Sequence, residues 1–127
     1  MVDANLIRKA YERYPELLSK GDVDGILELY AEGAVLEDPV GSELRVGKDA
    51  IREFYQASAG TVTLKVTGPV RIAGNEAATP MVIRFGPEGQ QQALDVISNM
   101  SFDDEGQIKS MKAWWRAEDI RPATLDD

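Results

Sequence analysis

The sequence predicts an α+β fold, with helices first along the chain and an antiparallel sheet after them. Up to about residue 60, apolar residues recur at three- and four-residue spacing, which is typical of amphipathic helices. After Gly60 the pattern changes to alternation with a period of two, which is typical of half-buried strands. No repeat, linker or low-complexity segment interrupts the 127 residues. The chain is therefore expected to form one domain, residues 1–127, with the helices packed on one face of the sheet.

Three helices are expected in the first part of the chain. The first runs from Asp3 to about Lys20, and Gly21 ends it. Its apolar stripe comprises Leu6, Ile7, Ala10, Tyr14, Leu17 and Leu18. Asp22 can cap a second helix. The apolar face of that helix comprises Ile26, Leu27 and Tyr30. A short strand over 34–38 precedes the third helix, roughly 48–58, whose apolar side comprises Ile51, Phe54 and Tyr55.

Strands are expected over 61–73, 77–85, 91–102 and 107–117. Gly68-Pro69 marks a bend in the first of them, and residues 86–89 and 103–106 have the composition of turns. The last ten residues, 118–127, are acidic and are expected to form a loose tail.

Charge and composition exclude several classes of function. The chain has 14 basic and 22 acidic residues, a net charge of -8, which argues against nucleic-acid and anionic-membrane partners. It has no Cys and no His, so disulfides and the commonest metal ligands are absent, and no metal or cofactor is expected. A site built only from carboxylates stays possible, although no EF-hand spacing is present. Without an apolar leader or spanning segment, the expected location is the cytoplasm.

Asp38 is the most informative single residue. With a period of two, Ala34, Leu36 and Asp38 share one face of the short strand, and Pro39 ends it. If Ala34 and Leu36 face the core, the carboxylate faces it too, and desolvation there raises its pKa and its basicity. In a chain without His or Cys, proton transfer falls to carboxylates, Tyr, Lys or hydroxyls. The alternative is that Asp-Pro is simply a common turn pair.

Hydroxyl groups also fall on apolar faces. Ser98 is the one polar member of the face that otherwise comprises Leu94, Val96, Met100 and Phe102, so it is expected to point inward. Tyr14, Tyr30 and Tyr55 lie on the apolar sides of the three expected helices, and three inward phenols suggest a shared hydroxyl network. Each of these hydroxyls could instead bond a nearby backbone carbonyl.

The final strand supplies an apolar wall. Trp115 and Met111 share one parity, and with Met81 and Met100 they could line an irregular apolar pocket, although core packing explains them almost as well. Trp114 has the opposite parity and is a candidate for a subunit contact. A base, hydroxyl donors and apolar residues together describe a site that removes a proton from carbon next to a carbonyl. The donors would hold the oxygen on which enolate charge develops.

These residues resemble the ketosteroid isomerase family, steroid Δ5-3-ketoisomerases of the NTF2-like superfamily. The most specific stretches are LEDPVGS, residues 36–42, and AIREFY, residues 50–55. The segments GDVDGI, TGPVR and ALDVI, which begin at Gly21, Thr67 and Ala93, support the resemblance over nearly the whole chain. The resemblance implies a cone-shaped fold, in which three helices pack on a strongly curved sheet that encloses an apolar pocket. It also implies a homodimer and an enzyme that needs no cofactor.

By this resemblance, Asp38 matches the general base that moves a proton from C4 of a 3-ketosteroid to C6. Tyr14 matches the tyrosine that donates to the C3 oxygen, and Tyr30 and Tyr55 match its supporting phenols. The pocket-lining positions are Phe54, Met81, Met100, Met111 and Trp115. The family, itself a standard example of pKa tuning, uses a protonated aspartic acid as second donor, where this chain has Ser98. A hydroxyl is neutral at any working pH but a weaker acid, so its bond to an enolate is expected to be weaker.

Other functions remain open because the same fold carries unrelated activities. A polyketide cyclase, or a dehydratase of the kind that relies on His, would use the same pocket. An epoxide hydrolase would need an inward Asp–Arg–Asp set, for which Arg71 and Arg84 are the strand arginines to consider, although Arg84 has the outer parity. A non-catalytic small-ligand-binding module is the alternative outside enzymes.

Overall fold

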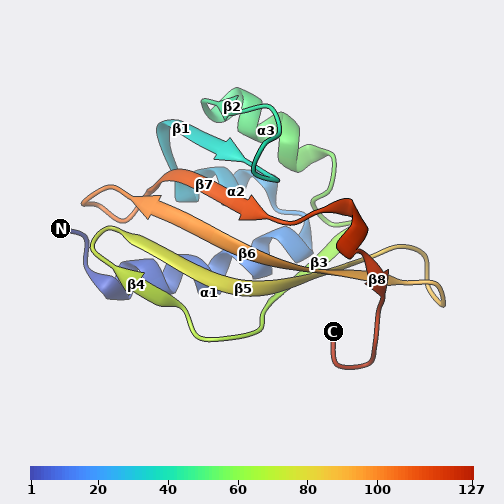
Figure 1. Ribbon diagram of the computed structural model, residues 1–127. Helices are drawn as coiled ribbons and strands as arrows, with labels where there is room; N and C mark the ends of the chain where they lie inside the picture. Colours follow the sequence, from blue (N-terminus) through green and yellow to red (C-terminus); the bar gives the residue numbers. More distant parts are fainter.

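A computed structural model describes all residues, 1–127, as three helices on one mixed sheet (Figure 1). The elements in chain order are α1 (Ala4–Lys20), α2 (Val23–Leu29), β1 (Tyr30–Glu37), β2 (Arg45–Val46), α3 (Lys48–Gln56), β3 (Val62–Val66), β4 (Arg71–Ala73), β5 (Glu76–Phe85), β6 (Gln92–Phe102), β7 (Ile108–Trp114), the 3₁₀ turn η1 (Ala117–Asp119) and β8 (Arg121–Pro122). The expected α+β class and helix count are confirmed.

The sheet has the order β2-β1-β7-β6-β5-β3, with β4 paired to β5 and β8 paired to β6. β1 runs parallel to β7, and every other pair is antiparallel. The long strands β5 and β6 cross the molecule, with α1 and α2 behind them and α3 above β1 (Figure 1). The sheet is curved but not closed, so its concave face leaves room for a cavity between strands and helices.

The first helix begins and ends as the sequence predicts. The Asp3 side chain accepts a hydrogen bond from the backbone N–H of Asn5, and Gly21 ends the helix in the left-handed conformation with φ of 80°. A side chain at Gly21 would also meet the backbone of Gly60, because a Cβ placed there lies 3.1 Å from Gly60 Cα. Leu6 was expected in the apolar stripe but is 41% exposed, whereas Tyr11, which was not expected there, is buried.

The largest differences from the predicted element boundaries fall at three places. Tyr30 is the first residue of β1 and does not belong to α2, because the chain becomes extended at this position. Residues 61–73 form two strands, since the Gly68-Pro69 segment separates β3 from β4. The last long strand ends at Trp114, so Trp115 lies outside it.

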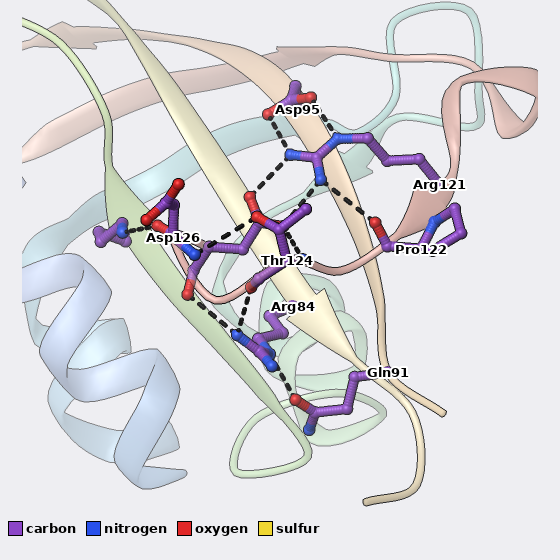
Figure 2. Close-up of polar contacts among 9 residues, drawn as sticks. Arg84, Gln91, Asp95, Arg121, Pro122, Thr124 and Asp126 are labelled. Atoms are coloured by element: carbon purple, nitrogen blue, oxygen red, sulfur yellow. Dashed lines mark hydrogen bonds and ion pairs between the residues drawn. The ribbon is translucent and has the colours of Figure 1, made fainter. Parts of the chain in front are cut away.

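The segment expected to be a loose tail makes ordered contacts in the structure. β8 pairs with β6 through Gln92 and Ala93. The Arg121 guanidinium bonds both Asp95 of β6, at 2.9 Å, and Asp127, at 2.7 Å. Arg84 donates to the Thr124 carbonyl at 3.0 Å, and Figure 2 shows these bonds holding the segment across the sheet. Partners from two strands therefore fix the last residues.

The outer face of the sheet carries an apolar pair. Ile97 of β6 lies directly opposite Trp114 of β7, and the two are 45% and 44% exposed. The sequence expectation of a homodimer through Trp114 stays a prediction. None of the helices has the length and apolar character needed to cross a membrane.

Candidate active site

A cavity of about 170 Å³ lies between the concave face of the sheet and the helices α1 and α3. Twelve of its fifteen lining residues are hydrophobic. The lining comprises Tyr14, Leu18, Asp38, Phe54, Tyr55, Ser58, Val62, Leu64, Met81, Ile83, Val96, Ser98, Met111, Ala113 and Trp115. Asp38 is the only ionisable carboxylate among them, and no Lys or Arg is present, so one charged group lies in an apolar surrounding.

Strand register brings Asp38 and Ser98 to the same part of the sheet. Glu37 at the end of β1 pairs with Lys112 of β7, so Asp38 follows at the level of Ala113. The backbone N–H of Val40 donates to the Ala113 carbonyl at 2.8 Å, which fixes the chain just after Asp38. Ala113 pairs on its other side with Ser98 of β6. The proposed base and the hydroxyl thus lie on either side of one residue, although 60 positions separate them in the sequence.

Asp38 receives a hydrogen bond that the sequence did not reveal. The Trp115 indole Nε1–H donates to Asp38 Oδ1 at 2.6 Å. Burial raises the pKa of the Asp38 carboxyl, and the bond from Trp115 partly offsets the shift by stabilising the anion. Trp115 was expected only to line the pocket, but it also orients the carboxylate.

Replacing Trp115 with Phe is expected to move the Asp38 pKa upward, because a donor to the anion is lost while burial remains. A base must be deprotonated, so with Asp38 as the base, as the family resemblance implies, kcat/KM would fall as pH drops through this pKa. The acid limb of the pH–rate profile should therefore lie at higher pH in Trp115→Phe than in the parent protein. The neighbouring phenols Tyr14 and Tyr30 do not interfere, since burial raises the pKa of each and keeps it neutral.

The pH–rate profile of Trp115→Phe checks this shift, and carbon NMR titration of the Asp38 carboxyl measures it without turnover. The exposed Trp114 is the matched control, and Trp114→Phe should leave the titration unchanged. An unshifted Asp38 titration in Trp115→Phe would mean that the indole only fills space.

Three phenols form a connected network beside the cavity. The Tyr55 hydroxyl lies 2.9 Å from the Tyr14 hydroxyl and 2.7 Å from that of Tyr30. All three side chains are buried. Tyr14 and Tyr55 line the cavity, whereas Tyr30 lies behind them. If Tyr30 donates to Tyr55 and Tyr55 to Tyr14, the Tyr14 hydrogen is free to point into the cavity. The expected shared hydroxyl network is therefore present.

Ser98 points inward, as its parity predicts, and is 4% exposed. Its hydroxyl has a partner that sequence reasoning missed, the phenol of Tyr11, at an oxygen–oxygen distance of 3.5 Å. Tyr11 is buried as well, so all four tyrosines of the chain are buried. The signal for Tyr11 was available, because it stands four residues after Ile7 and three before Tyr14.

Four of the five expected pocket residues line the cavity: Phe54, Met81, Met111 and Trp115. Met100 does not, because it is fully buried in the core. Nearby, the Tyr11 hydroxyl contacts the carbonyl of Ala77, the cross-strand partner of Met100, and the Tyr11 ring packs edge-on against Phe102. Along β6, Val96 and Ser98 line the cavity and Met100 does not.

The arrangement can accept a proton at Asp38 and donate hydrogen bonds from Tyr14 and Ser98 within one apolar space. No group of three or more His, Cys, Asp or Glu residues lies close enough to hold a metal ion. The low dielectric strengthens bonds to a developing negative charge.

Comparison with known proteins gives both a family and two kinds of relative. Residues 11–111 match the family model of the SnoaL-like domain. The chain is 38% identical over 114 residues to a steroid Delta-isomerase of Nocardioides simplex, covering 90% of this chain and 93% of the relative. It is 29% identical over 127 residues to the epoxide hydrolase LasB of Streptomyces lasalocidi, covering 81% of this chain and 45% of that one. The solved structure of SalBIII, described as an epoxide hydrolase/cyclase-like enzyme of pyran ring formation in salinomycin, has a TM-score of 0.87. It is 27% identical, and the match covers 97% of this chain and all of the other.

Proposed function

The chain belongs to the SnoaL-like domain family, and from this membership and the cavity we propose that it is a steroid Δ-isomerase. The substrate would be a Δ5-3-ketosteroid and the product its conjugated Δ4 isomer. One observation carries the proposal: a single carboxylate, Asp38, shares an apolar cavity with the hydroxyls of Tyr14 and Ser98.

The proposed reaction has two proton transfers. Asp38 removes a proton from C4, and the electron pair of that bond moves toward the carbonyl to form a dienolate. Tyr14 and Ser98 donate hydrogen bonds to the oxygen, on which negative charge has developed. Asp38 then returns the proton to C6, so the double bond moves into conjugation and the carboxylate is regenerated. No atom is gained or lost, and the chain's own groups suffice.

The cavity size suits one end of such a substrate. Engineered apolar cavities of roughly 150 Å³ bind benzene, so about 170 Å³ accommodates about one six-membered ring. The ring that carries the ketone would enter toward Tyr14 and Ser98. The remaining rings would lie beyond this cavity, on the side where it opens to solvent.

Epoxide hydrolysis is the second candidate, because two of the similar proteins carry that description. The Asp–Arg–Asp set that an epoxide hydrolase would need is not found in the cavity. Arg84 bonds Gln91 and the C-terminal segment, and Arg71 is exposed. The cavity holds one carboxylate and no cation, so both the Arg and the second Asp of that set are missing from it. These observations favour the isomerase.

Product mass separates the candidates in one experiment. The protein is incubated in parallel with a Δ5-3-ketosteroid and with a set of alkyl epoxides, and products are analysed by mass spectrometry. Isomerisation leaves the mass unchanged while forming a conjugated enone, whereas hydrolysis adds one water. Conversion of an epoxide to a diol, with the ketosteroid unchanged, would indicate that the protein is an epoxide hydrolase and not an isomerase. Unchanged substrates with measurable binding would indicate a non-catalytic binding module.

Ser98→Ala is expected to lower kcat by up to about 10², the lower part of the range for loss of one oxyanion donor, because an aliphatic hydroxyl is the weaker of the two donors. KM should change little, since the charge on the oxygen develops only during the reaction. Steady-state kinetics measure the change. Ser101→Ala is the matched control, because Ser101 lies on the same strand but bonds Ser110. Equal kcat in Ser98→Ala and the parent would remove Ser98 from the mechanism.

A further inference from the structure

Tyr11 is a buried phenol that the proposed mechanism does not use. It is 2% exposed, takes no part in the network of Tyr14, Tyr30 and Tyr55, and does not line the cavity. Its hydroxyl lies 3.4 Å from the Ala77 carbonyl and 3.5 Å from Ser98 Oγ. It therefore reaches Ser98 from the side away from the cavity.

Counting hydrogens limits how this pair can be arranged. Each hydroxyl has one hydrogen and can also accept. In one arrangement Ser98 donates to Tyr11, and Tyr11 donates to the Ala77 carbonyl. In the other Tyr11 donates to Ser98, and the Ser98 hydrogen points into the cavity. The second arrangement leaves no acceptor unsatisfied, because the Ala77 carbonyl already accepts from Asn99 Nδ2 at 2.8 Å.

An anionic oxygen in the cavity favours the second arrangement. A charged acceptor makes a hydrogen bond roughly twice as strong as a neutral one, so the Ser98 hydrogen turns toward it. Tyr11 is then free to donate to Ser98 Oγ, and a hydroxyl that accepts a hydrogen bond becomes a better donor. The Tyr11 hydrogen is always available, because burial raises the pKa of this phenol to about 12.

We propose that Tyr11 is a positioning residue for Ser98: its phenol donates to Ser98 Oγ and directs the Ser98 hydrogen onto the ligand oxygen. This role rests on the proposed function, in which Ser98 is an oxyanion donor. The Tyr11 phenol would then lie behind Ser98, the weaker of the two donors, much as the Tyr55 phenol lies behind Tyr14. The ligand class it recognises is an enolate or phenolate oxygen.

The test measures binding of substituted phenols, whose phenolate oxygen stands in for the dienolate and whose binding needs no turnover. Tyr11→Phe should weaken phenolate binding about three- to tenfold, the size of one modest hydrogen bond. In a Ser98→Ala background, the same change should weaken it less than about twofold, since the bond it supports is already gone. Ser101→Ala, on the same strand, should leave binding unchanged in both backgrounds. In turnover, Tyr11→Phe should lower kcat and leave KM nearly unchanged.

A second variant is expected to change phenolate affinity in the opposite direction. Fluorotyrosine at position 11 is a stronger acid and should tighten phenolate binding if the parent protein folds with it. Equal weakening by Tyr11→Phe with and without Ser98 would mean that Tyr11 acts through packing and would overturn the proposal. So would unaltered binding in both Tyr11 variants, or no phenolate binding by the parent. Coupling between Tyr11 and Ser98 in a protein without isomerase activity would retain the positioning role and reject the proposed function.

Discussion

Asp38→Asn is expected to lower kcat by about 10²–10⁴, the range for loss of a general base. The loss should fall near the upper end, because no other carboxylate lines the cavity and the chain has no His or Cys to replace it. Binding of the steroid product should be unchanged or tighter, since the variant removes a charge that faces an apolar ligand. Stopped-flow absorbance gives kcat, and equilibrium titration gives the affinity.

Glu43→Gln is the matched control, because Glu43 is an exposed carboxylate in the loop that follows Asp38. It should retain full activity. A fully active Asp38→Asn variant would exclude Asp38 as the base. Loss of both binding and turnover would instead indicate that Asp38 shapes the cavity.

Asp38→Asn is also expected to change the stability of the folded protein. The folded-state pKa of Asp38 lies above its unfolded value, because burial disfavours the anion. The folded protein then holds this proton to higher pH, and stability falls as pH rises from the unfolded pKa through the folded one. Asp38→Asn removes that fall, so the variant should be the more stable protein at neutral pH. A gain in stability on removal is expected of a functional group that itself destabilises the folded protein.

Tyr14→Phe is expected to lower kcat by about 10²–10³, the range for loss of one oxyanion donor. The effect should exceed that of Ser98→Ala, because a phenol is the stronger donor and the Tyr55 hydroxyl lies within hydrogen-bond distance of Tyr14. Steady-state kinetics on a Δ5-3-ketosteroid measure it, with phenolate affinity as the readout that needs no turnover.

Tyr30→Phe is the matched control for Tyr14→Phe. Both changes remove one hydroxyl bonded to Tyr55, but Tyr30 lies outside the cavity. Tyr30→Phe should therefore cost much less. Equal losses in the two variants would mean that the network as a whole matters and that Tyr14 makes no direct bond to the ligand oxygen.

Period-two patterning predicted the inward direction of the polar groups well. Asp38 and Ser98 both face the cavity because each follows the parity of apolar neighbours that the core must bury. Their closeness depends on the parallel pairing of β1 with β7, which joins residues more than 70 positions apart. A pattern within one strand carries no information about its partner, so the shared site needed the family resemblance or the structure.

Residues at element ends were less predictable. Tyr30 continues the apolar face of α2, yet the chain is already extended there, and periodicity alone does not fix such a boundary. Trp115 leaves β7, and its bond to Asp38 spans 77 positions, which no local pattern reveals. The acidic tail looked loose by composition, but Arg121 within it pairs with Asp95 of β6, and Arg84 of β5 donates to the backbone oxygen of Asp127.

The most direct test of the isomerase mechanism is the ultraviolet absorbance of the purified protein mixed with 5-androstene-3,17-dione, followed in parallel with Asp38→Asn. The proposed mechanism predicts fast growth of the conjugated-enone band with the parent protein and growth at least about 10² slower with the variant. No growth with the parent, or equal growth with both proteins, would contradict it.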